Sequence, residues 1–280
     1  MAVLLGLLVA VSYGSADFLG GFASKSSPAG AAVLGSQSVG LVVACGYFLV
    51  LGGGTLTGAD VGLSALAGVA GVFGVTCLFR GLAVGRMSVV APVSAVGSAV
   101  LEVVWGLARG ERPGAVALVG VALALIAIAV VAGSATEHPL RTVSARAELA
   151  LGVGAAIGFG GVLICLSETG TGSGMWPVVI ARLVPLPLLA LILVAARRPL
   201  LVRRADRGLI AAAGTLDATA NVLLLLAVRH DLLSLVAPVA ALYPAATVLL
   251  AKVFVHEQIG RARAAALVVA IGGLALISVR

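Results

Sequence analysis

The sequence predicts an all-α integral membrane protein with ten transmembrane helices arranged as two inverted five-helix repeats. Hydrophobic residues make up 61% of the 280 residues and charged residues only 10%. The mean hydropathy is +1.20, and a water-soluble chain of this length could not bury so much apolar surface. Continuous apolar runs of about 20 residues recur along the chain, and each is long enough to cross a bilayer as a helix. One stretch of the chain also occurs twice in similar form.

The two copies of this stretch are residues 88–133 and 234–279, which align without a gap at a spacing of 146 residues. Each copy has a proline near the start of an apolar run, a polar hinge with a glutamate, and a second apolar run. Matches of Ala and Val carry little weight in such a chain, so the informative matches are Ser88 with Ser234, Pro92 with Pro238, Glu111 with Glu257 and Gly114 with Gly260. A spacing near half the chain length indicates a duplicated unit.

Polar residues, glycines and prolines mark the ends of five spans in the first half, residues 1–133. Span one, 3–23, ends at SKSSP, and span two, 30–51, ends at GGGTLTGAD. Span three, 61–84, ends at the tight turn Gly85-Arg86, and span four, 87–108, ends at RGERP. Span five, 114–132, leads into a polar linker, 134–147.

Five further spans follow in the second half, residues 148–280. They are expected at 149–167, 175–195, 208–228, 232–255 and 262–278, with the basic segment RRPLLVRRADR after span seven and the hinge HEQIGR before span ten. Because each half holds an odd number of spans, the second half enters the membrane in the opposite sense, with a pseudo-two-fold axis in the membrane plane. Gly154 and Gly158 form a GxxxG pattern in span six, which is typical of close helix packing.

These features together resemble one family. Ten spans in two inverted halves, the Ser-x-x-Ala-Pro opening of spans four and nine, and the Gly-Glu-Arg and His-Glu-Gln hinges are similar to the drug/metabolite transporter superfamily, EamA type. The resemblance covers essentially the whole chain. It implies export or exchange of small metabolites through a central cavity lined mainly by spans one, three, four, six, eight and nine. It also implies that spans five and ten pack at the periphery.

Spans one and eight each place a carboxylate at membrane depth, where an ionisable group costs about 3 kcal/mol or more unless it has a partner or a watery cavity. In span one, Tyr13 and Asp17 are four residues apart and share a helix face. That face offers an aromatic wall and a carboxylate to a substrate amine; the alternative is that Asp17 reaches the membrane interface. In span eight, Asp217 and Asn221 are again four apart, and Asp217 lies too deep to snorkel easily.

Span four carries a polar stripe on an otherwise apolar helix, formed by Ser94, Ser98, Glu102 and Trp105. If this face meets the cavity, Glu102 is a proton or cation site, because burial can raise the pKa of a carboxylate. The alternative is a structural ion pair with Arg or Lys.

Spans seven and nine each contain one further polar residue of interest, Arg182 and Tyr243. Arg182 in span seven is expected to be a partner for a carboxylate or a helix end. Tyr243 lies in the middle of span nine beside Pro244, and a proline there removes a backbone hydrogen bond and kinks the helix. Tyr243 completes the predicted substrate-binding set, which is Tyr13, Asp17, Ser94, Ser98, Glu102, Trp105, Asp217, Asn221 and Tyr243.

The charges at membrane depth suggest the class of substrate. Three carboxylates, Asp17, Glu102 and Asp217, stand against Arg182, which favours a cationic or zwitterionic substrate, or proton coupling. We therefore expect a secondary active transporter that exports small amine-containing metabolites or drugs in exchange for protons, by alternating access around the cavity. The alternatives are a channel and a non-transporting membrane scaffold.

Other classes of function have little support in the sequence. The chain lacks HExxH and GxSxG motifs and zinc-ligand spacing, and its three histidines lie in expected hinges, so no enzyme, metal site or cofactor is expected. The net charge of +7 comes from Lys and Arg in short hinges, where they meet lipid headgroups, so nucleic acid is not an expected partner.

The expected partners are the lipid bilayer of the cell membrane, a small-molecule substrate and protons, and the chain is either a monomer or a homodimer. The positive-inside rule places both termini outside the cytoplasm. The family resemblance implies that both termini lie inside, so the orientation stays open.

Overall fold

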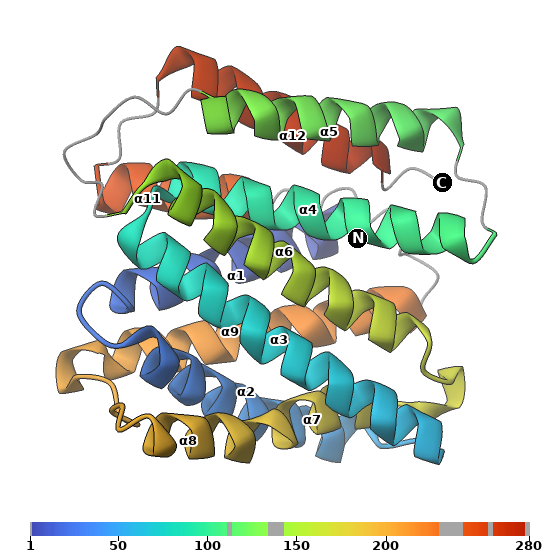
Figure 1. Cartoon of the computed structure of the whole chain (residues 1–280). Helices are drawn as coiled ribbons and strands as arrows, with labels where there is room; N and C mark the ends of the chain where they lie inside the picture. Colours follow the sequence, from blue (N-terminus) through green and yellow to red (C-terminus); the bar gives the residue numbers. More distant parts are fainter. Residues whose placement is uncertain (1, 111–113, 134–142, 230–242, 257–259, 278–280) are drawn as a thin grey trace.

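The computed structural model describes residues 2–110, 114–133, 143–229, 243–256 and 260–277, and these residues are overwhelmingly helical (Figure 1). An isolated bridge between Gly53 and Gly174 is the β pairing within these ranges. In the same part of the chain, six helical segments are long and apolar enough to cross a bilayer: α1, α2, α3, α4, α6 and the segment made by α7 and α8. An all-α membrane protein is therefore the fold class that the structure supports.

The helices fall close to the expected spans because long apolar runs without internal polar breaks favour continuous helices across a bilayer. Two short 3₁₀ helices, η1 (Thr171–Ser173) and η2 (Arg204–Asp206), lie in connections. The α-helices are α1 (Ala2–Ala23), α2 (Ala29–Leu51), α3 (Gly58–Val84), α4 (Met87–Ala108), α5 (Ala115–Gly133), α6 (Ala145–Ser167), α7 (Trp176–Leu183), α8 (Pro185–Ala195), α9 (Arg207–Arg229), α11 (Tyr243–Phe254) and α12 (Arg261–Ile277).

Span seven contains a break that was not predicted, and part of span nine lies outside the described residues. Span seven, expected at 175–195, is found as one apolar segment, 176–195, but its helix is interrupted at Val184 between α7 and α8. Pro185 and Pro187 at the start of α8 lack the N–H groups that would continue the hydrogen bonds of α7. Residues 232–242 of span nine, and the hinge residues Glu111 and Glu257, lie outside the described ranges.

The helices pack as a bundle in which segments distant in sequence lie side by side (Figure 1). Helix α1 packs against α9, α11 and α3, and helix α6 packs against α3 and α4. Helix α2 contacts α9 and α7. Helices α5 and α12 lie next to each other at one edge of the bundle, against α4 (Figure 1).

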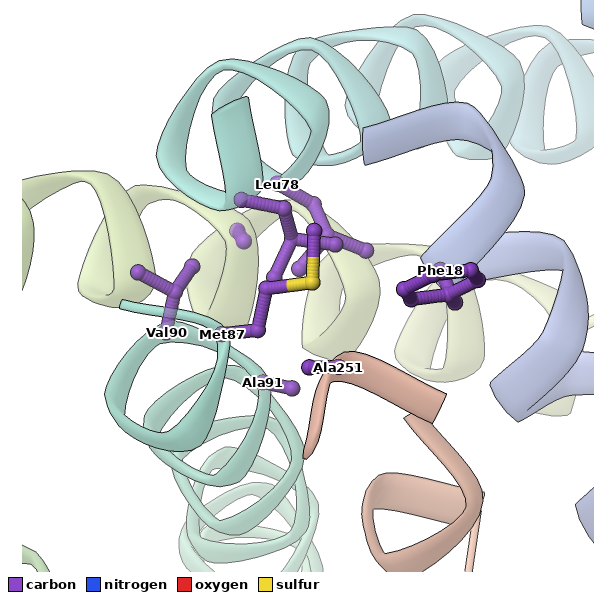
Figure 2. Close-up of a cluster of buried hydrophobic side chains, with 8 residues drawn as sticks. Phe18, Leu78, Met87, Val90, Ala91 and Ala251 are labelled. Atoms are coloured by element: carbon purple, nitrogen blue, oxygen red, sulfur yellow. The ribbon is translucent and has the colours of Figure 1, made fainter. Parts of the chain in front are cut away.

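A buried apolar cluster joins helices of both halves (Figure 2). Phe18 of α1, Leu78 of α3, Met87 and Val90 of α4, and Ala251 of α11 meet there. The outward faces carry large apolar side chains at high exposure, as lipid contact requires. The molecule is thus apolar both inside and outside, and polar groups within it need a specific explanation.

One buried ion pair has a structural explanation. The Arg86 guanidinium lies 2.8 Å from a Glu148 carboxylate oxygen, and both side chains are almost fully buried. Glu148 also accepts a hydrogen bond from the Arg86 backbone N–H. Glu148 lies in the first turn of α6, where the positive end of the helix favours a carboxylate. The pair therefore fixes the tight turn between α3 and α4 against the start of α6.

Candidate functional site: a carboxylate-lined cavity between four helices

A small cavity lies among α1, α2, α3 and α9. Its empty volume is about 260 Å³, of which the centre of a water molecule can occupy about 20 Å³. One water needs roughly 10–15 Å³ on that measure, so the cavity in this conformation has room for about one water molecule. The residues that line it are Ala16, Asp17, Ser36, Gln37, Val75, Phe79, Ala213, Gly214 and Asp217.

Asp217 forms an ion pair at the cavity wall. Arg182 of α7 reaches it from the side, with 2.7 Å between Nη2 and the carboxylate oxygen Oδ2. The other terminal nitrogen, Nη1, donates a hydrogen bond of 3.0 Å to Gln37 Oε1. The Arg182 side chain is only 8% exposed, whereas Asp217 is 31% exposed. Arg182 thus neutralises the charge of Asp217 without lining the cavity itself, while the Asp217 side chain remains partly exposed to the cavity.

A glycine makes room for this arginine. A Cβ atom added to Gly40 of α2 would overlap Nη1 of Arg182. The guanidinium therefore lies close to the backbone of α2, and any larger residue at this position would displace it.

Asp17 also lines the cavity, and its surroundings differ from those of Asp217. In the ranges that the structure describes, no hydrogen bond or ion pair joins the Asp17 carboxyl group. The side chain is half-buried in α1, a segment apolar enough to cross a membrane. A carboxylate at such a depth needs a cation, a proton or ordered water to offset its desolvation. The cavity therefore combines one neutralised carboxylate with one that has no cation beside it among the described residues.

Two predicted tyrosines lie near this wall. The rings of Tyr13 and Tyr243 meet edge to face, with 6.2 Å between their centroids and 62° between their planes. Thr247, which is fully buried, donates a hydrogen bond of 3.1 Å to the Gly14 carbonyl oxygen and so holds α11 against α1. Tyr13 is one helical turn from Asp17, and neither tyrosine is among the residues that line the cavity.

Asn221 has a local role in α9. Its side-chain amide donates a hydrogen bond of 2.8 Å to the Asp217 backbone carbonyl, one turn earlier in the same helix. This bond uses one of the two amide N–H groups, and Asn221 is not part of the cavity lining.

The polar stripe of α4 lies away from the cavity. Ser94 and Ser98 are buried in the packing of α4. Ser98 donates to the Ala95 carbonyl oxygen at 2.9 Å, whereas Ser94 Oγ has no hydrogen-bond partner in the described residues. Glu102 is exposed at the surface of the bundle. None of the three lines the cavity, so their predicted role in substrate binding stays a prediction.

Trp105, the last residue of the stripe, belongs to a second and more open hollow with Arg109, Ser167 and Glu168. Its indole Nε1–H donates to Glu168 at 3.2 Å, and the Arg109 guanidinium lies 5.5 Å from the indole ring centroid. Arg109 also pairs with Glu168. The hydrogen bonds from Arg109, and then from Trp105, lower the pKa of Glu168, so this end of α4 carries a fully ionised surface pair at neutral pH.

The cavity lining includes two polar residues that were not predicted from the sequence, Ser36 and Gln37. Gln37 could have been identified from the sequence, because a Gln side chain within an apolar membrane span needs a polar partner. Arg182 was expected to pair with a carboxylate or a helix end, and it pairs with Asp217.

Comparisons with known proteins define the fold and no more. No protein-family model matches the chain, and no curated protein matches it significantly. A solved crystal structure has a TM-score of 0.62 to this chain at 18% sequence identity, and the alignment covers 98% of this chain and 95% of the other. The two chains share an overall fold across nearly their whole lengths, and at this identity the likeness does not extend to a substrate.

Proposed function

We propose that the chain is a secondary active transporter of the cell membrane that exports small amine-containing metabolites or drugs in exchange for protons. Asp17 carries this proposal. It is a carboxyl group at membrane depth that faces a cavity and has no cation beside it in the described residues. An organic ammonium and a proton can each neutralise it, and a site that accepts either can exchange one for the other.

The charges around the cavity suggest the stoichiometry of the exchange. Arg182 already balances Asp217, so the site has one uncompensated carboxylate. When an ammonium group binds, Asp17 releases one proton to water, and when the ammonium leaves, Asp17 takes up one proton again. One positive charge therefore moves in each direction, and we expect the exchange to be electroneutral.

The packing of the helices supports two related halves. Under the proposed repeat, α1 corresponds to α6, α2 to α7 with α8, α3 to α9, α4 to α11 and α5 to α12. The most extensive contacts then have a counterpart: α3 with α6 mirrors α1 with α9, and α4 with α6 mirrors α1 with α11. The pair formed by α5 and α12 corresponds to itself. This pattern supports two five-helix repeats, 1–133 and 148–280. Membership in the drug/metabolite transporter superfamily, EamA type, is proposed from the resemblance of the sequence motifs alone.

A carrier must expose its site to the two sides in turn. The cavity described above has room for about one water molecule, so an organic amine enters only when the helices around it separate. A permanently open pore would need a wider passage. A cavity this narrow therefore favours a carrier over a channel.

The test uses the purified protein in proteoliposomes with a pH gradient and a panel of radiolabelled small amines. We expect amine uptake to be coupled to proton movement in the opposite direction and to be insensitive to an imposed membrane potential. Asp17→Asn should reduce proton-coupled uptake by about tenfold or more, because a charge-assisted contact is lost. A transported amine whose flux is unchanged in Asp17→Asn would contradict the proposal.

Glu168→Gln is the matched control, because it removes a carboxylate from the exposed end of the bundle and not from the cavity. It should transport like the parent protein.

A further inference from the structure

Asp60 joins the two halves at one end of the bundle. It lies in the first turn of α3 and forms a capping box with Thr57. Its Oδ2 accepts hydrogen bonds from the Thr57 backbone N–H at 2.9 Å and hydroxyl at 2.7 Å. Its other oxygen, Oδ1, accepts a hydrogen bond of 2.7 Å from the Gly170 N–H, in the connection between α6 and α7. Nearby, the Thr55 N–H donates to the Gly172 carbonyl oxygen at 3.0 Å. We call this end, formed by 52–57 and 168–175, the glycine end.

Asp206 has the corresponding position at the other end. It lies directly before α9 and is 8% exposed. Its Oδ2 accepts hydrogen bonds from the hydroxyl groups of Ser26 at 2.7 Å and Ser27 at 2.6 Å, in the connection between α1 and α2. Ser27 Oγ in turn accepts a hydrogen bond of 3.0 Å from the Arg203 backbone N–H. We call this end, formed by 24–28 and 196–207, the basic end, because it carries several exposed arginines.

The two aspartates are equivalent by sequence as well as by position. They are 146 residues apart, which is the spacing of the repeated stretch. Each precedes or begins the third helix of its half, and each accepts hydrogen bonds from the first connection of the other half. Helix α2 runs from the basic end to the glycine end, and its 23 residues span about 35 Å. The two contacts thus lie at opposite ends of the bundle (Figure 1).

Both contacts hold helices that line the cavity. Val75 and Phe79 of α3 and Ala213 and Asp217 of α9 are part of its wall, and the two aspartates fix the starts of these same helices. Each contact crosses between the halves. When two halves rock about a central site, contacts between them at one end must break for that end to open, while those at the other end persist.

We propose that Asp60 and Asp206 are equivalent latches, each of which closes one mouth of the central cavity, so that release of one latch alone opens the cavity at that end. The proposal depends on the alternating-access function proposed above. The described structure, with both contacts formed and room for about one water molecule in the cavity, is then the state in which neither latch is released.

The latch at the basic end does not titrate near neutral pH. The hydroxyl groups of Ser27 and then Ser26 lower the pKa of Asp206. A carboxyl group with a lowered folded pKa stabilises the folded contact above its unfolded pKa and loses this contribution only as the pH falls through the folded pKa. Movement of the helices must therefore break this contact, and a change of pH in the neutral range does not.

The test measures which side of the membrane reaches the cavity. Cys45, Cys77 and Cys165 are replaced by alanine, and Ser36→Cys places a reporter thiol in the cavity wall. A membrane-impermeant thiol reagent is then applied from either side of oriented vesicles. Asp206→Ala should raise the labelling rate from the basic end about tenfold, and Asp60→Ala should raise it from the glycine end about tenfold, because each removes hydrogen bonds to a charged group.

Two further variants remove the donors and leave both carboxylates in place. Ser26→Ala with Ser27→Ala should behave like Asp206→Ala. Gly170→Pro should behave like Asp60→Ala, because it deletes the N–H at a residue whose φ of −63° suits proline. Gly170→Ala is its control, since a Cβ there meets its nearest neighbour at an ordinary 3.5 Å and the N–H remains.

The latches would be established if the Asp206 variants raise the labelling rate from the basic end and the Asp60 variants raise it from the glycine end. Shifts toward the same side, or folded variants with the parent's labelling rates, would overturn them. The labelling needs no substrate, so a chain that carries no amine would still report on the latches. Conversely, proton-coupled amine transport without opposite shifts would reject the latches and leave the proposed function in place.

Discussion

Asp217→Asn is expected to lower the free energy of unfolding by on the order of 3 kcal/mol, because it leaves the Arg182 guanidinium buried beside a neutral amide. Gln37 alone cannot compensate for the lost charge, since its oxygen already accepts one hydrogen bond from Arg182. Asp217 is partly exposed to the cavity, which places the effect at the lower end of the range for buried pairs. Denaturant unfolding in detergent micelles measures it.

A double-mutant cycle separates the ion pair from other effects of the substitution. Arg182→Gln combined with Asp217→Asn should recover about 2 kcal/mol relative to the sum of the single variants, because neither charge is then left alone. Glu168→Gln, which breaks an exposed Arg–carboxylate pair at the bundle end, should change stability little. If the two single variants were simply additive, Arg182 and Asp217 would not act as a pair.

Gly158→Ala should destabilise the bundle by about 1–3 kcal/mol, and Gly158→Leu should prevent folding. A Cβ at position 158 of α6 would overlap the Cα of Gly74 and approach the Ala70 carbonyl oxygen to 2.7 Å, both on α3. These are backbone atoms, so they cannot turn aside as a side chain could, and the two helices must separate. The expected readouts are the melting temperature and the yield of monodisperse protein in detergent.

Gly46→Ala is the control for this experiment. Position 46 lies within α2, and a Cβ there has no neighbour within 4 Å. The substitution should leave stability unchanged or raise it slightly, because alanine favours helix more than glycine does. Equal losses at positions 46 and 158 would indicate that close approach of α3 and α6 is not what Gly158 provides.

The position of the helices could be read from the sequence because membrane depth imposes long apolar runs, and polar or Gly/Pro segments must end them. The break at Val184 was missed, although Pro185 and Pro187 were visible in the sequence. Hydropathy does not register a proline that divides a span, since the composition stays apolar on both sides.

Only part of the candidate site followed from the sequence. Asp17 and Asp217 were identified because an ionisable group at membrane depth is rare and needs a reason. Helical periodicity places Ser94, Ser98 and Glu102 on one face of α4, but it does not predict whether that face packs against another helix, the cavity or lipid. The partner of Arg182 depends on how α7 crosses α9 and α2, which a single sequence does not specify.

The equivalence of Asp60 and Asp206 could have been noticed in the sequence. Asp60 and Asp206 are separated by the spacing of the repeated stretch, yet both lie outside the aligned copies. A residue pair at the repeat spacing becomes informative only when both members make equivalent contacts with the opposite half.

Counterflow in proteoliposomes tests the central claim most directly, because it asks whether one site faces the two sides in turn. Vesicles are loaded with an unlabelled amine that the protein transports, and uptake of the labelled amine is followed from a dilute outside solution. A carrier predicts transient accumulation of label inside, faster than in unloaded vesicles. Uptake that the internal amine does not accelerate, together with an amine conductance, would contradict the account and indicate a channel.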